Sequence, residues 1–142
     1  MRNLWIVVLL IFVTSCGTNE ESKEKQLETW KNEVVKADKE KRLSELKPNR
    51  YNVAFLIMDG TFNTELTAPY DIFQHTIFRK GIKPMNVFTV ANTDKAITTF
   101  EGMRILPDFN YLKDSLPRID ILVVPSAEHH LDSDLEDTAM ID

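Results

Sequence analysis

Cysteine is almost absent from this sequence, which has one such residue, Cys16, among 142. A single thiol excludes a disulfide framework within the chain and any zinc site built from several cysteines. Glycine and proline are also scarce, at 4 and 6 residues, which excludes collagen-like and low-complexity chains. Basic residues are fewer than acidic ones, at 17 against 22. The sequence therefore lacks the basic excess of a nucleic-acid-binding protein, and we expect no nucleic-acid partner.

The overall composition is that of a chain that folds. Hydrophobic residues make up 43% of the sequence and charged residues 27%, which is a globular rather than a disordered composition. The length corresponds to about one domain on the usual scale of roughly 100 to 200 residues.

The N-terminus has the features of an export signal. Arg2 precedes an apolar run over residues 4–13, too short for a membrane-spanning helix of about 20 residues. Val13-Thr14-Ser15-Cys16 resembles the lipobox of bacterial lipoproteins, whose cysteine becomes the lipidated N-terminus. We therefore expect a signal peptide over residues 1–15, lipidation at Cys16, and anchoring to a membrane on the exported side of the bacterial cell envelope. The alternative is an ordinary signal peptide or buried anchor with an incidental cysteine.

A charged segment follows the cysteine. Between Glu20 and Lys47, eight acidic and eight basic residues are mixed without glycine or proline. A narrow apolar stripe recurs at helical spacing, formed by Leu27, Trp30, Val34 and Ala37. The stripe fails before three heptads are complete, which favours a solvated helical spacer over a dimeric coiled coil. Residues 16–49 are thus expected to be a lipidated N-terminus and a charged helical linker.

Alternating strand and helix patterns occupy residues 50–142. Apolar runs over residues 53–58, 85–91 and 119–124 predict buried strands of a parallel sheet. Between the first two runs, apolar residues at helical spacing predict a helix over residues 66–77 that ends near Gly81, which completes a βαβ unit. A short hairpin is predicted over residues 96–106 and a further amphipathic helix over residues 131–140. The fold class is therefore α/β.

Four stretches of this segment resemble the ThiJ/PfpI family. Val53–Gly60 is an apolar strand with an Asp-Gly turn, and Thr64–Phe73 is an acidic residue followed by a helix containing Ala-Pro-Tyr-Asp-Ile-Phe. Gly102–Asp108 resembles the central hairpin of the family, and Ile119–Pro125 resembles the strand before its Pro-Gly-Gly loop. The family belongs to the class I glutamine amidotransferase-like superfamily, which includes the parkinsonism-associated deglycase. The resemblance covers residues 50–142 and implies a truncated, flavodoxin-like three-layer sandwich with a mostly parallel sheet.

The resemblance also implies where a site would lie. Family members carry a nucleophilic cysteine in a sharp turn beyond the part that these residues match. Glu65 stands at the position of the family acid that acts on the thiol, while Ser126 and Ala127 stand at the oxyanion loop, in place of its paired glycines. We therefore expect Glu65 as the catalytic position and Ser126 and Ala127 as the binding position, with no nucleophile, cofactor or metal. Glu65 is equally interpreted as a carboxylate favoured at a helix N-terminus.

The histidines give a weaker signal. Glu128, His129 and His130 follow the end of a predicted strand, where α/β folds place their sites. Adjacent side chains do not share a face, so we interpret the pair as loop histidines rather than metal ligands. His75 is interpreted as a partly buried surface residue of the preceding helix.

These features predict a membrane-anchored lipoprotein with a truncated ThiJ/PfpI-like domain that is inactive because it lacks the nucleophilic cysteine. Two alternatives stay open: a non-catalytic small-molecule or protein-binding module, and the N-terminal part of an incomplete cysteine hydrolase or hydratase. A half sandwich would leave strand edges unpaired. We therefore also expect a homo-oligomer or a partner chain that completes the sheet.

Overall fold

The computed structural model describes residues 18–130, 136 and 138–141 of the chain. The chain divides into two compact units, residues 1–41 and 42–142, and each is described by itself. Cys16 and the expected signal peptide lie outside the described residues.

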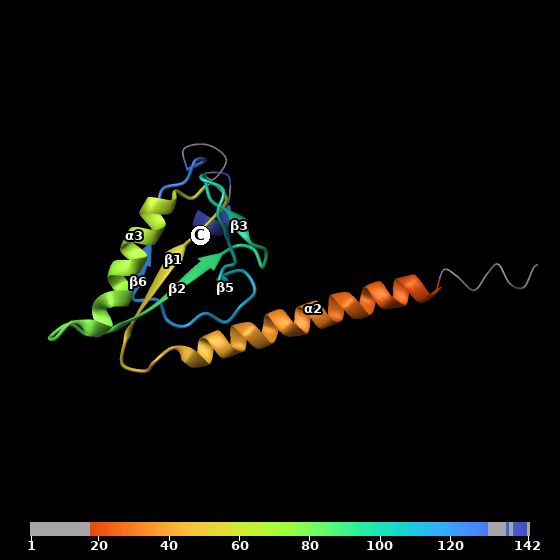
Figure 1. Cartoon of the computed structure of the whole chain (residues 1–142), viewed down its shortest axis with the longest axis horizontal. Helices are drawn as coiled ribbons and strands as arrows, with labels where there is room; N and C mark the ends of the chain where they lie inside the picture. The colour runs from red at the N-terminus through yellow and green to blue at the C-terminus, as the bar shows by residue number, and fades with distance from the viewer. Residues whose placement is uncertain (1–17, 131–135, 137, 142) are drawn as a thin grey trace, which may run out of the picture. The chain divides into compact units, whose positions relative to one another are not determined.

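The charged segment forms helix α2, Thr18–Glu45 (Figure 1). No glycine or proline interrupts it, Glu20 and Glu21 lie in its first turn, and Arg42 lies in its last turn, as the helix dipole favours. Trp30 and Val34 of the apolar stripe are exposed on this chain. The helix predicted for this segment is thus present.

The second unit contains a four-stranded sheet in the order β5-β2-β1-β6, with every pair parallel (Figure 1). An antiparallel hairpin, β3–β4, follows β2. The α/β class and the mostly parallel sheet are confirmed. The bounds are β1 Tyr51–Leu56, α3 Asn63–Gln74, η1 His75–Phe78, β2 Met85–Ala91, β3 Ile97–Thr98, β4 Arg104–Ile105, β5 Phe109–Asn110, β6 Ile121–Val123 and α4 Thr138–Ile141.

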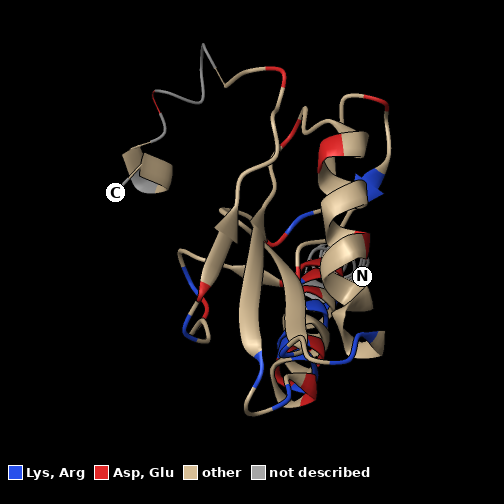
Figure 2. Ribbon diagram, turned by 90° about the vertical axis from the view of Figure 1, so that its left-hand side faces the viewer, with Lys and Arg blue, Asp and Glu red and all other residues tan. Residues whose placement is uncertain are grey.

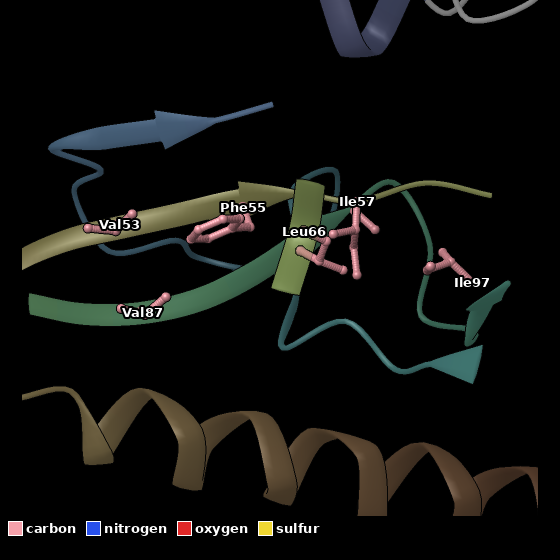
Figure 3. Packing of buried hydrophobic residues seen from close by; sticks show 7 residues of the cluster. Val53, Phe55, Ile57, Leu66, Val87 and Ile97 are labelled. Carbon is pink, nitrogen blue, oxygen red and sulfur yellow. The ribbon is translucent and has the colours of Figure 1, made fainter. Parts of the chain in front are cut away.

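The central strands β1 and β2 are buried on both faces, which explains why they are apolar without interruption. The third apolar run was wrongly predicted to be buried, because β6 lies at the edge of the sheet and its Leu122 is 55% exposed. On the face that α3 covers, Phe55 lies between its neighbours Val53 and Ile57, and Leu66 of α3 packs against them (Figure 3). The opposite face is built on Ala54, Phe88, Val90 and Phe109, and partly buried side chains cover it: Leu46, Leu56, Tyr111, Leu116 and Ile119.

The predicted elements are found with shifted ends. The strand predicted over residues 85–91 is β2, and the predicted hairpin is β3–β4. The first strand ends at Leu56 rather than residue 58, because the backbone N–H and C=O of Met58 both bond the Thr61 hydroxyl and begin a turn. The third predicted strand is shorter, at Ile121–Val123. Of the helix predicted over residues 131–140, residues 131–135 and 137 lie outside the described part, and α4 covers the end.

The helix predicted to reach Ile77 was too long. α3 ends at Gln74, and a 3-10 turn follows it. The Thr76 hydroxyl donates to the Phe73 carbonyl at 2.6 Å and accepts the Met85 N–H at 3.1 Å, so it ties the chain to the start of β2 instead of continuing the helix. Ile77, expected on the buried face of a helix, is consequently 46% exposed.

Candidate functional site

The site predicted from sequence lies where the strand order reverses. From β1 the chain passes to β2 on one side, and β6 later pairs with β1 on the other side. In open α/β sheets, ligands bind at such a point, outside the carboxyl ends of the strands. The loops that follow β1 and β6 meet there through an isolated antiparallel bridge between Thr61 and Ala127.

Gly60 makes this junction possible. The residue has φ of +79°, a left-handed conformation that glycine adopts at little cost. A Cβ at Gly60 would lie 3.1 Å from the Cβ of Glu128, so the two loops pack too closely for a side chain. The Gly60 carbonyl accepts the Glu128 N–H at 3.0 Å.

Glu65 and Ser126, both predicted from sequence, are brought together at the junction. Glu65 lies in the first turn of α3, which has no side-chain cap at Phe62. Its Oε2 accepts the backbone N–H of Ser126 at 2.9 Å. Ala127, the other predicted binding position, is buried in the bridge to Thr61.

The Glu65 carboxyl is held in its ionised form. Hydrogen bonds from the hydroxyl and backbone amide of Ser126 lower the pKa of Glu65. Desolvation opposes them, and His130 makes a lesser contribution that also lowers the pKa of Glu65. An ionised carboxylate has no proton to donate and acts as a hydrogen-bond acceptor or a base. The Ser126 amide is already bonded to the Glu65 carboxylate.

Glu65 is expected to titrate below the usual range of a glutamate. Because its pKa is lowered on folding, its contribution to stability is present above the pKa of the unfolded chain and is lost as the pH falls through the folded-state pKa. The carboxyl carbon shift in an NMR titration measures this value directly. Glu65→Gln removes the effect, whereas Ser126→Ala keeps the backbone N–H and so a part of the lowering. A normal pKa at Glu65 in the unmodified chain would contradict the geometry.

The adjacent histidines have different neighbours. His129 Nε2 lies 3.7 Å from the Glu128 carboxylate, whereas His130 interacts electrostatically with Glu65. His75 lies in the 3-10 turn, where its Nδ1 is 3.5 Å from the carboxylate of Asp71. Within residues 18–130, 136 and 138–141, no group of three or more His, Cys, Asp or Glu side chains is arranged to hold a metal ion.

A cavity of about 410 Å³ opens at the same edge of the sheet, beside the junction. Glu65 and Ser126 are not among its lining residues. Its polar lining comes from segments that follow β1, β2, β5 and β6: Asp59, Asn92, Thr93, Lys95, Tyr111 and His129. One carboxylate oxygen of Asp59 is already engaged, because it accepts the Thr98 N–H at 2.6 Å.

Sequence reasoning missed most of this cavity. Asp59 directly follows the first predicted strand and Asn92 directly follows the second. Since the carboxyl ends of parallel strands meet at one edge, their positions were the available signal. Of the residues singled out from sequence, His129 alone lines the cavity.

No helix in the described part of the chain combines the length and apolar character needed to cross a membrane.

Solved structures similar to this chain include members of the ThiJ/PfpI family and the DJ-1 superfamily, and an AraC family transcriptional regulator from Pseudomonas putida. A ThiJ/PfpI family protein from Bacillus anthracis is 21% identical with a TM-score of 0.47, over 62% of this chain and 41% of the other. A DJ-1 superfamily protein from Agrobacterium tumefaciens is 17% identical with a TM-score of 0.43, over 62% and 42%. A ThiJ/PfpI family protein from Pseudomonas syringae is 20% identical with a TM-score of 0.38, over 55% and 29%.

The matched region thus spans less than half of the length of each of the three ThiJ/PfpI and DJ-1 proteins. No protein-family model and no curated protein matches the sequence.

Proposed function

We propose that this protein is an exported, lipid-anchored lipoprotein whose ThiJ/PfpI-like α/β domain binds a small molecule rather than performing thiol chemistry. The observation that carries the proposal is the contact between Glu65 and Ser126. In a thiol enzyme of this type, the acid serves the nucleophile and the loop amide serves the oxyanion. Here the acid and the amide satisfy one another at 2.9 Å.

Composition supports the same conclusion. The sequence contains one cysteine, Cys16, and its lipobox-like surroundings commit that thiol to a lipid. A cysteine hydrolase or hydratase built on this domain would need a thiol from outside these 142 residues. The cavity at the carboxyl edge of the sheet can bind a ligand without a thiol, and it lies where α/β folds hold their ligands.

The cavity lining suits a small organic acid that also carries hydrogen-bond donors, because Lys95 and the Asp59 carboxylate both line it. Lys95 offers an ammonium group to a carboxylate or phosphate, and the side chains of Thr93 and His129 offer hydrogen-bonding groups to hydroxyls. Apolar side chains complete the wall, including Ile57 and Ile97. Pockets with a few polar groups on an apolar wall are typical of small-molecule sites.

Lipidation is tested at Cys16. Cells that express the full chain are labelled with an alkyne analogue of palmitate, and the chain is isolated and its label is measured. We expect Cys16→Ser to abolish incorporation, whereas Ser15→Ala keeps a small residue before the cysteine and retains the label. An unmodified chain that incorporates no label would contradict the lipoprotein proposal.

Binding without turnover is tested on the full chain with a panel of small organic acids. A ligand of the cavity should raise the unfolding temperature and be recovered unchanged, and Lys95→Gln should abolish the shift. Iodoacetamide should have no effect on binding, because no thiol participates. Consumption of a panel compound that iodoacetamide blocks would instead favour the cysteine enzyme.

A further inference from the structure

A short exposed loop between α3 and β2 has an unusual composition. The loop, residues 77–83, has the sequence Ile-Phe-Arg-Lys-Gly-Ile-Lys. Its three large apolar side chains are exposed: Ile77 by 46%, Phe78 by 74% and Ile82 by 50%. Three exposed basic side chains lie among them in the sequence: Arg79, Lys80 and Lys83. We call this segment the basic–apolar loop.

The base of the basic–apolar loop is fixed while its tip projects. Thr76 ties the two ends together, since its hydroxyl bonds both the Phe73 carbonyl and the Met85 N–H. At the tip, Gly81 turns the chain with φ of +79°, and a Cβ placed there would meet no atom within 4 Å. In Figure 1 the loop extends away from the end of α3, past the start of β2.

The segment that contains the loop carries basic residues and no acidic ones. No acidic residue occurs between Asp71 and Asp94, although acidic residues outnumber basic ones in the whole chain. Asp71 is paired with His75 at 3.5 Å. A partner for this surface must therefore carry negative charge and accept apolar side chains at the same time.

The same end of the sheet carries further cations. Parallel strands begin at one edge, where both basic and acidic segments appear in Figure 2. Arg50 and Arg118 come shortly before β1 and β6, and Arg118 lies 3.7 Å from the Asp120 carboxylate. Lys83 Nζ lies 4.0 Å above the ring of Tyr51, which places an amphipathic aromatic side chain beside the loop. The chain enters the sheet at this edge, through Tyr51.

We infer that the basic–apolar loop docks the domain onto a bilayer that contains anionic phospholipids. Phe78 and Ile82 enter the boundary between headgroups and acyl chains, and Arg79, Lys80 and Lys83 contact the lipid phosphates. Basic residues beside exposed apolar side chains bind anionic interfaces in this manner. The contact goes beyond the proposed lipid anchor, because it would act on the folded domain itself.

The test follows the depth of the loop in vesicles. The full chain with Cys16→Ser and Ile82→Cys carries one thiol, to which an environment-sensitive fluorophore is attached. Vesicles of phosphatidylcholine with or without phosphatidylglycerol contain lipids with a nitroxide on the acyl chain. We expect quenching of the label in vesicles with phosphatidylglycerol and little quenching in phosphatidylcholine alone. Since Cys16 is replaced, the result does not depend on whether the protein is lipidated.

Two variants and one control position make the outcome specific. Replacing Arg79, Lys80 and Lys83 by glutamine should lower the ratio of docked to undocked label by about a hundredfold, since each cation contributes several-fold. Phe78→Ser should also lower this ratio. A label at Met103, 49% exposed in the β3–β4 hairpin, should not be quenched.

Three results would overturn the inference: no quenching with phosphatidylglycerol, equal quenching in phosphatidylcholine, or equal quenching at Met103. Shielding of the Ile82 label that rises with protein concentration in the absence of vesicles would instead identify a second copy of the chain as the partner.

Discussion

Phe55→Ala is expected to lower the free energy of unfolding by about 3–5 kcal/mol, the usual cost of removing a buried aromatic side chain. Phe55 is fully buried at the centre of the sheet, on the face that α3 covers (Figure 3). Its ring lies 5.2 Å from the ring of Tyr70 and 6.0 Å from that of Phe73, so it joins β1 to α3. Chemical denaturation followed by circular dichroism measures the loss.

Phe78→Ala is the matched control for this prediction. It removes the same side chain at a position that is 74% exposed, and we expect a change of less than about 0.5 kcal/mol. A comparable loss in both variants would mean that Phe55 is not at the centre of the core. If Phe55→Ala does not fold, Phe55→Leu provides the measurement instead. It keeps most of the apolar volume and should lower the free energy of unfolding by about 1 kcal/mol.

Asp108→Ala is expected to lower the free energy of unfolding by about 2–3 kcal/mol, because it breaks a network at the open edge of β2. The carboxylate accepts the Thr89 N–H at 2.8 Å and the Thr89 hydroxyl at 3.1 Å, and its other oxygen lies 2.8 Å from Arg42 Nε. β5 pairs with β2 only at Val90 and Ala91, so the Thr89 N–H has no strand to accept it. Without Asp108, a buried donor is left without its acceptor.

The ion pair between Arg42 and Asp108 contributes less to the free energy of unfolding than the hydrogen bonds from Thr89 to Asp108. Burial alone would lower the pKa of Arg42, but the charge and hydrogen bond of Asp108, together with Tyr70 and Glu45, outweigh it, so the pKa of Arg42 is raised. Both side chains keep partial contact with water, which limits the pair to about 1 kcal/mol. Asp108→Asn removes the charge and keeps an acceptor oxygen, so it should cost about half as much as Asp108→Ala.

Asp71→Asn provides a comparison for the network. Its carboxylate pairs with His75 at 3.5 Å on an exposed helix face, and we expect almost no change in stability. Equal losses for Asp71→Asn and Asp108→Ala would show that the Asp108 network does not support β2. Thermal unfolding of the three variants under one buffer condition measures the differences.

The network also explains how β2 avoids an exposed edge. Side chains satisfy groups that a missing neighbour strand would otherwise pair: Arg42 Nη2 donates to the Val87 carbonyl at 3.3 Å, and the Tyr70 hydroxyl donates to the same carbonyl at 3.4 Å. Unpaired edges invite pairing with another chain, and side chains that cover an edge suppress it. The partner expected to complete the sheet therefore stays a prediction, with this part of the β2 edge already covered.

Much of the fold followed from local pattern. The apolar runs predicted β1 and β2 because strands buried on both faces have no polar alternation. β6 was found from the same kind of run, although it is an edge strand with Leu122 exposed. The charged helix and the β3–β4 hairpin were also predicted, because spacing and turn residues act over a few positions. β5 was missed because Phe109–Asn110 is too short to show a period, and the helix was extended past Gln74 because the Thr76 contact with Met85 depends on a distant strand.

The candidate site divides in the same way. The sequence alone determined that Glu65 begins a helix and that Ser126 follows an apolar strand. Only the tertiary structure decided that these residues, 61 positions apart, satisfy one another, and that Asp59, Lys95 and His129 line a common cavity. The spacing of apolar residues predicts which side of a single helix or strand is buried. Contacts between distant residues depend instead on the order of the strands and the path of the loops. The single cysteine is therefore a property of the sequence, but the hydrogen bond between the Glu65 carboxylate and the Ser126 amide is a property of the fold.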